Sequence, residues 1–176
     1  NLVPLDTVTV IPKVSYYLET GISFVEEFQD VVLGLDTLSS SDVDLERVFV
    51  EGQPFYLDSY VGQVKMDVAN PGFKAYTKKL FLMPVPITRP VYLELDYKCN
   101  QDFVVGYIIS TPSTGADENA LISLRATGTT DDMIWKHIYI DLTDQFVGKT
   151  DATGFGITFT ALYDDTNPEG IIFMDN

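Results

Sequence analysis

Apolar and polar residues alternate along three successive stretches between residues 133 and 176, with turn-forming residues between the stretches. The first stretch, 133–142, carries aliphatic residues on one side, and its other side carries Trp135, His137, Tyr139 and Asp141. The second stretch, 154–163, alternates aromatic or aliphatic residues with glycine and threonine, and the third, 170–176, is short and apolar. A period of two is typical of β-strands that bury one face. The pattern therefore predicts three consecutive, half-buried strands.

The same alternation continues upstream in residues 90–99. The inward positions there are Val91, Leu93, Leu95 and Tyr97, and the outward positions are Tyr92, Glu94, Asp96 and Lys98. The next stretch, 103–109, is apolar on both faces, which predicts a central strand. Shorter strands are predicted at 47–50, 62–68, 79–83 and 120–126, and loops are predicted at 36–46 and 111–119. Many short strands without a long helix indicate an all-β fold, an antiparallel two-sheet β-sandwich.

The chain length predicts a single domain over residues 1–176, with residues 1–20 as a peripheral edge strand or extension. Pro4 and Pro12 restrict that first segment to an edge, because proline cannot donate to a strand ladder. A chain of 19.7 kDa buries about 70% of its surface on folding, which is enough for a core without disulfides. The single cysteine, Cys99, has no partner in the chain and is predicted to be a small buried hydrophobe.

The formal net charge of −15 excludes a phosphate backbone as a natural partner, so nucleic acid binding is not expected. An anionic membrane surface is excluded for the same reason. No apolar run approaches the roughly 20 residues of a transmembrane helix. The excess of carboxylates has two interpretations, which are solubility and a divalent cation site. The sequence contains no signal peptide, and because it begins at Asn1 rather than at a methionine it is interpreted as trimmed, which leaves room for an export signal before it.

The order of these strands resembles the β-jelly-roll domains of carbohydrate-binding modules, such as those on surface lipoproteins of polysaccharide-degrading bacteria. The resemblance covers about residues 80–176 and rests on the strand at 90–98, the Trp135–Thr143 stretch, the 154–159 stretch and the closing Ile-Phe-Met-Asp-Asn sequence. It implies a jelly-roll sandwich that binds glycan without catalysis, in an extracellular or outer-membrane surface protein. In those families the tryptophan at the position of Trp135 packs against the core.

The resemblance also implies a structural calcium ion that joins the first and last strands. Asp175 matches the closing aspartate of the family pattern, whereas the opening position is occupied here by glutamine. Glu27 or Asp30, which flank that position, would supply the first charged ligand, because calcium prefers carboxylate and carbonyl oxygens. The alternative is that these carboxylates are solvated strand ends.

Sugar-binding sites usually rely on exposed aromatic rings that stack on a pyranose. The predicted ligand-binding residues are therefore aromatic residues of loops and outward strand faces, namely Phe55, Tyr56, Tyr60, Tyr76 and Tyr92. The cluster from Phe55 to Tyr60 is the first of these to test. For each ring the alternative is a purely structural role.

Two other classes of function stay open from the sequence. The first is a structural or protein-interaction domain of a surface assembly without a sugar site, which predicts an exposed apolar patch. The second is a glycoside hydrolase, because Glu94 and Asp96 share one strand face; a jelly-roll glucanase would need a third carboxylate where Lys98 and Cys99 stand. His137, the only histidine, is predicted to be a packing or surface residue.

Overall fold

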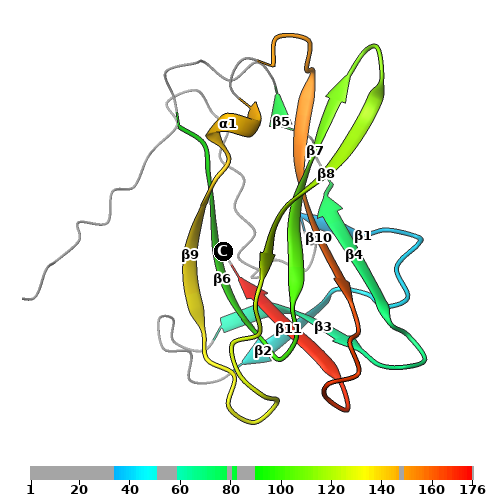
Figure 1. Ribbon diagram of the computed structural model, residues 1–176, viewed down its shortest axis with the longest axis vertical. Coiled ribbons are helices and arrows are strands. Elements are labelled where there is room, and N and C mark those ends of the chain that lie inside the picture. Colours follow the sequence, from blue (N-terminus) through cyan, green and yellow to red (C-terminus); the bar gives the residue numbers. More distant parts are fainter. Residues whose placement is uncertain (1–33, 51–58, 79–80, 83–89, 147–148, 176) are drawn as a thin grey trace, which may run out of the picture.

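The computed structural model describes residues 34–50, 59–78, 81–82, 90–146 and 149–175, which form two antiparallel β-sheets (Figure 1). In spatial order, sheet A contains β1 (Leu35–Thr37), β4 (Gly72–Thr77), β10 (Gly154–Leu162), β7 (Phe103–Thr111) and β8 (Gly115–Leu124), and β5 (Phe81–Leu82) also pairs with β10. Sheet B contains β2 (Glu46–Val50), β3 (Ser59–Met66), β11 (Gly170–Asp175), β6 (Tyr92–Cys99) and β9 (Lys136–Asp141). The predicted two-sheet β-sandwich is confirmed.

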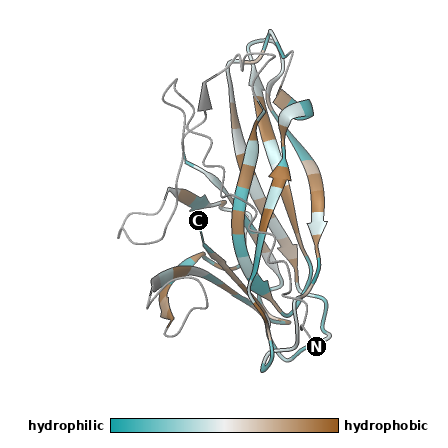
Figure 2. Ribbon diagram, turned by 90° about the vertical axis from the view of Figure 1, so that its left-hand side faces the viewer, coloured by the Kyte–Doolittle hydropathy of each residue, from teal (hydrophilic) through white to brown (hydrophobic). Residues whose placement is uncertain are grey.

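The hydrophobic core lies between the sheets and is built from alternate residues of their strands. β6 contributes Leu95 and Tyr97, β11 contributes Ile172, and β10 contributes Ile157 and Phe159, all of which are buried. Figure 2 shows hydrophilic and hydrophobic residues alternating along the strands. Successive side chains of a strand point to opposite faces. The intervening residues of β6 and β9 therefore point away from the core.

A single helical turn, α1 (Thr143–Phe146), closes one end of the sandwich after β9. Asp141 Oδ1 accepts a hydrogen bond from the backbone N–H of Thr143 at 2.9 Å, and the hydrogen bonds from Thr143 lower the pKa of the Asp141 carboxyl. Phe146 is fully buried and stacks on Phe155, with ring centroids 4.0 Å apart. No helix in the described part of the chain is long and apolar enough to cross a membrane.

Several strand boundaries differ from the sequence prediction. β8 begins at Gly115, inside the stretch predicted as a loop, and ends at Leu124 rather than at residue 126. β1 and β4 were not predicted as strands. β1 begins one residue before the predicted loop at 36–46 and continues into it. Of the strand predicted at 79–83, the structure describes only Phe81–Leu82. The edge strand or extension predicted for residues 1–20 lies outside the described residues.

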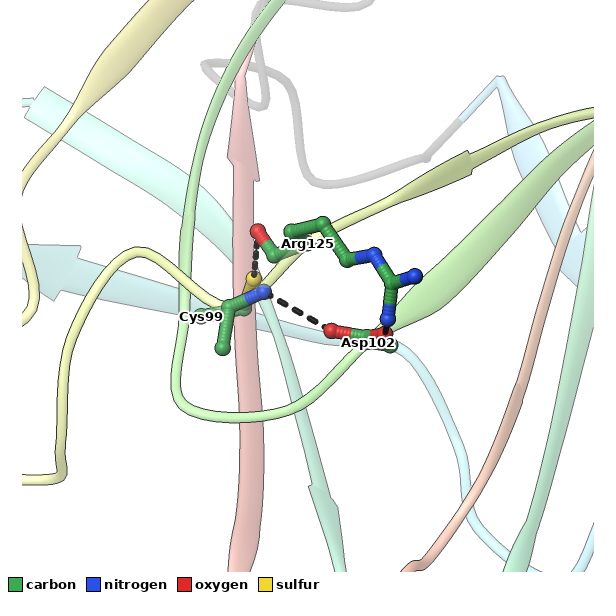
Figure 3. Close-up of polar contacts among 4 residues, drawn as sticks. Cys99, Asp102 and Arg125 are labelled. Atoms are coloured by element: carbon green, nitrogen blue, oxygen red, sulfur yellow. Dashed lines mark hydrogen bonds and ion pairs between the residues drawn. The ribbon is translucent and has the colours of Figure 1, made fainter.

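Polar contacts connect the turn from β6 to β7 with the residues that directly follow β8 (Figure 3). Asp102 Oδ2 pairs with Arg125 Nη1 at 2.5 Å, and its Oδ1 accepts the backbone N–H of Ala126 at 3.0 Å. The Cys99 thiol donates to the carbonyl oxygen of Arg125, with sulfur and oxygen 3.6 Å apart. Cys99 is fully buried, which confirms its predicted role, and burial raises the pKa of its thiol from the ordinary 9.0 to about 11.

This raised pKa predicts a loss of stability in alkali. Between pH 9 and about 11 the unfolded thiol is ionised while the folded thiol keeps its proton, so the folded state binds more protons and its stability falls as pH rises. The expected loss is about 2 kcal/mol over this window. Urea denaturation at pH 8 and at pH 10.5 measures it. Cys99→Ala is the control, and an equal alkaline loss in that variant would show that the thiol is not responsible.

Candidate functional site

The outward side chains of β6 and β9 form one continuous polar and aromatic surface, which we call the β6–β9 face. It consists of Tyr92, Glu94, Asp96 and Lys98 of β6, His137, Tyr139 and Asp141 of β9, and Trp135 just before β9. The two strands pair antiparallel, so Glu94 lies opposite Tyr139 and Asp96 lies opposite His137. Because the inward partners on β6 are core residues, all of these outward side chains lie on the other side of sheet B.

His137 lies between two carboxylates at the centre of the β6–β9 face. Its Nδ1 is 2.7 Å from Asp96 Oδ1, and its Nε2 is 3.3 Å from Glu94 Oε1. The Tyr139 hydroxyl donates a hydrogen bond to the same Glu94 oxygen at 3.1 Å. The rings of His137 and Tyr139 meet edge to face, with centroids 5.0 Å apart. The network fixes the orientation of Glu94, His137 and Tyr139 without a ligand.

Two tyrosine rings of this face are open to solvent. Tyr92 is 47% exposed and Tyr139 is 55% exposed. Tyr139 lies opposite Glu94 and Tyr92 lies opposite Asp141, so the two tyrosines are diagonal neighbours across the strand pair. Diagonal neighbours are close enough for one ligand to contact both rings. Glu94 and the Tyr139 hydroxyl supply hydrogen-bonding groups beside the rings.

Two carboxylates of sheet B are buried although they point away from the core. Asp96 is 3% exposed, Asp175 is buried, and the two residues lie directly opposite each other on β6 and β11. Asp96 Oδ2 has no hydrogen-bond partner and is shielded from solvent. Within the residues that the structure describes, no group of three or more His, Cys, Asp and Glu side chains is placed to hold a metal ion. Glu27 and Asp30 lie outside these residues, so the calcium site stays a prediction.

A cation and two aromatic rings occupy the other end of the face. The Lys98 ammonium lies 5.2 Å from the centroid of the Trp135 ring and 4.6 Å from that of Phe173, which is opposite Lys98 on β11. The two rings are 6.4 Å apart. Burial lowers the pKa of the Lys98 ammonium. Trp135 is half-buried on this outer surface, so the expectation that it packs against the core is wrong.

The predicted ligand-binding residues lie in different places. Tyr92 belongs to the β6–β9 face. Tyr60 packs against the core from β3, and the Arg47 guanidinium lies 3.2 Å from its ring centroid. Tyr76 is half-buried and points outward from β4 in the other sheet. Phe55 and Tyr56 lie outside the described residues. Of the predicted ligand-binding residues that the structure describes, neither Tyr60 nor Tyr76 belongs to the same face as Tyr92.

The sequence analysis did not select Tyr139, Lys98 or Phe173 as ligand-binding residues. The alternation in 133–142 already placed Tyr139 beside Trp135 and His137, and the alternation in 90–99 gave the outward set with Lys98. What was missing was the pairing of β9 with β6 and of β6 with β11, which links strands distant in sequence. A search for pairs of alternating strands with aromatic and charged outward residues would have selected this face.

The alternative functions gain less support from the geometry. A glycosidase needs two accessible carboxylates on either side of the scissile bond, whereas Asp96 is buried and Glu94 is held by Tyr139 and His137. A structural domain would present an apolar patch. The exposed large apolar residues of the described chain outside the β6–β9 face lie on separate elements and turns, namely Phe49, Val68, Ile122, Ile134 and Leu162.

The chain matches no family model and no curated protein sequence. Its fold is similar to a carbohydrate-binding module specific for non-crystalline cellulose, with a TM-score of 0.55, 11% identity, and coverage of 88% of this chain and 97% of that one. The fold is also similar to a xylan-binding module of Paenibacillus barcinonensis Xyn10C, with a TM-score of 0.55 and 12% identity. That match covers 86% of this chain and 94% of the module. An exo-β-agarase matches with a TM-score of 0.52 and 8% identity, and the match covers 88% of this chain and 24% of the agarase. The fold is that of a carbohydrate-binding-module-like β-sandwich.

Proposed function

We propose that this domain binds a polysaccharide chain through the β6–β9 face and performs no catalysis, as part of a secreted or surface-anchored protein. The observation that carries the proposal is the pair of exposed tyrosines, Tyr92 and Tyr139, beside the Glu94–His137 network. The similarity of the fold to modules described as binding xylan and non-crystalline cellulose supports these two polysaccharides as the first ligands to test.

The chemistry of the face suits a sugar chain. A pyranose presents C–H groups on its flat faces, which stack on aromatic rings, and hydroxyl groups around its edge, which both donate and accept hydrogen bonds. Tyr92 and Tyr139 supply rigid apolar area at a low cost in side-chain entropy. Glu94 accepts hydrogen bonds from sugar hydroxyls, and the Tyr139 hydroxyl, whose proton is donated to Glu94, can accept one, so both kinds of hydroxyl contact are provided for. The existing hydrogen bonds hold these groups in place before a ligand arrives, which lowers the cost of binding.

The proposal is tested by affinity electrophoresis through gels that contain xylan, hydroxyethylcellulose or other soluble polysaccharides, followed by calorimetric titration. We expect at least one polysaccharide to retard the domain. Tyr139→Ala and Tyr92→Ala are each expected to weaken this binding about thirtyfold, corresponding to about 2 kcal/mol for the loss of a central aromatic contact.

Two variants on the other sheet serve as controls. Leu162→Ala removes an exposed side chain of β10 and is expected to leave binding unchanged. Tyr76→Ala removes the outward ring of β4 and is expected to do the same. If Tyr76→Ala abolished binding while Tyr139→Ala did not, the ligand would lie on sheet A and the assignment of the face would be wrong. Uniform mobility of the unmodified domain in every gel would overturn glycan binding itself.

A further inference from the structure

Charge is divided along the β6–β9 face. Glu94 and Asp141 lie beside the exposed tyrosines, and the buried Asp96 lies in the next row, opposite His137. Lys98 lies at the other end, opposite Phe173 of β11. Lys98 follows Glu94 by four positions along β6, a distance of about 13 Å in an extended strand. A sugar chain that follows β6 over this distance passes from a carboxylate-bearing region to a cationic one.

The Lys98 ammonium has an unusual environment for a chain of net charge −15. Its contacts are with the faces of Trp135 and Phe173, and no carboxylate of the described residues forms an ion pair with it. Ring faces attract the cation but do not satisfy its three N–H donors with strong acceptors. A half-buried ammonium in this position gains a charge-assisted hydrogen bond when an anionic group approaches it.

We propose that Lys98, Trp135 and Phe173 form a subsite for the anionic substituent of a polysaccharide, a carboxylate or a sulfate ester. This inference rests on the proposed function, because the rest of the sugar chain lies on Tyr92 and Tyr139. The two rings hold the ammonium at this end of the face, and the ammonium binds the anionic group of the substituted unit. A chain charged at every unit would place anions beside Glu94 and Asp141, where like charges repel. The face therefore selects a mostly neutral backbone with isolated anionic groups.

The test uses one backbone with three kinds of substituent, each at a low degree of substitution: hydroxyethylcellulose, carboxymethylcellulose and cellulose sulfate. Glucuronoxylan and the same xylan with its carboxyl groups reduced to alcohols give a second matched pair. We expect the domain to bind an anionic form about tenfold more tightly than its neutral counterpart. The carboxylate and sulfate arms distinguish the two sources of charge. The advantage should shrink between 50 and 500 mM salt, because salt screens the ion pair.

Lys98→Met keeps the length and the apolar stem of the side chain and removes its charge. We expect this variant to bind the anionic and neutral polysaccharides with similar affinity, because the tenfold preference is lost, whereas Lys98→Arg keeps the preference. Thermal denaturation of both variants checks that they fold, and the salt dependence of the unmodified domain tests the inference independently of any substitution.

The outcomes separate this inference from the proposed function. The subsite is overturned if the domain binds neutral and anionic forms with equal affinity. It is also overturned if Lys98→Met lowers the affinity for both forms by the same factor, because Lys98 then only supports the two rings. Glycan binding itself stands in both cases. If neither the celluloses nor the xylans bind, the subsite falls together with the proposed ligands. A preference that disappears in Lys98→Met and persists in Lys98→Arg supports the subsite.

Discussion

Phe146→Ala is expected to lower the free energy of unfolding by about 3 to 5 kcal/mol, the usual cost of removing a fully buried phenylalanine ring. Phe146 is completely buried, stacks on Phe155 and meets the edge of Tyr107, with ring centroids 4.0 Å and 5.7 Å apart. The ring joins α1 to two strands of sheet A, so its loss leaves a cavity at the end of the sandwich. Urea denaturation measures the effect as a lower midpoint with an unchanged m-value.

The matched control is Leu162→Ala, which truncates a side chain that is 71% exposed. A substitution at such a site is expected to change stability by no more than about 0.5 kcal/mol. If Phe146→Ala also cost less than about 1 kcal/mol, the stacked arrangement would not contribute to the core in solution.

Gly106→Ala is expected to destabilise the domain by about 3 kcal/mol, at the upper end of the cost of overpacking. Gly106 follows a register irregularity in the β7–β8 pairing. A Cβ atom on this residue would lie 2.6 Å from the carbonyl oxygen of Asn119 and 2.6 Å from Thr158 Oγ1. The carbonyl belongs to the paired backbone of β8, and Thr158 is buried, so neither group can move away easily. Thermal denaturation would report the loss as a lower midpoint.

Gly115→Ala provides the comparison, because a Cβ atom there meets nothing within 4 Å. Its backbone φ of 75° lies in the left-handed region, so alanine is expected to cost about 1 kcal/mol through backbone strain alone. A cost for Gly106→Ala no larger than that of Gly115→Ala would mean that β7 and β8 separate readily at residue 106.

The strands that lie over the core were predictable because their inward residues are large and apolar. β6, β7, β10 and β11 were placed from their sequences with their starts correct to within two residues. In β4 the inward residues are Phe73, Ala75 and Thr77, while the outward Tyr76 is aromatic, so the contrast between the two faces is weak. The first residues of β8 are exposed on both faces and are held by hydrogen bonds to β7, which leaves no hydrophobic pattern. Such a strand is specified by its partner rather than by its own sequence.

The candidate site was only partly predictable. The outward direction of Tyr92, Glu94, Asp96 and Lys98 followed from alternation and is confirmed. Alternation does not say which strand lies beside β6, so the contacts of Glu94 with Tyr139 and of Lys98 with Phe173 could not be derived. Burial of Asp96 was also unexpected, because an outward aspartate is normally solvated. Long-range pairing, rather than the choice of residues, limited the prediction.

The position of β11 in the middle of sheet B has a consequence for how the domain is made. β11, drawn in red in Figure 1, lies between β3 and β6 and is the last of the described strands in the chain. During synthesis β3 and β6 leave the ribosome first, and each waits with an unpaired edge until residues 170–175 emerge. Sheet B therefore assembles in one late step that joins distant segments, a topology of high contact order that folds slowly. A nascent chain arrested before β11 would carry two open strand edges and would be prone to aggregate.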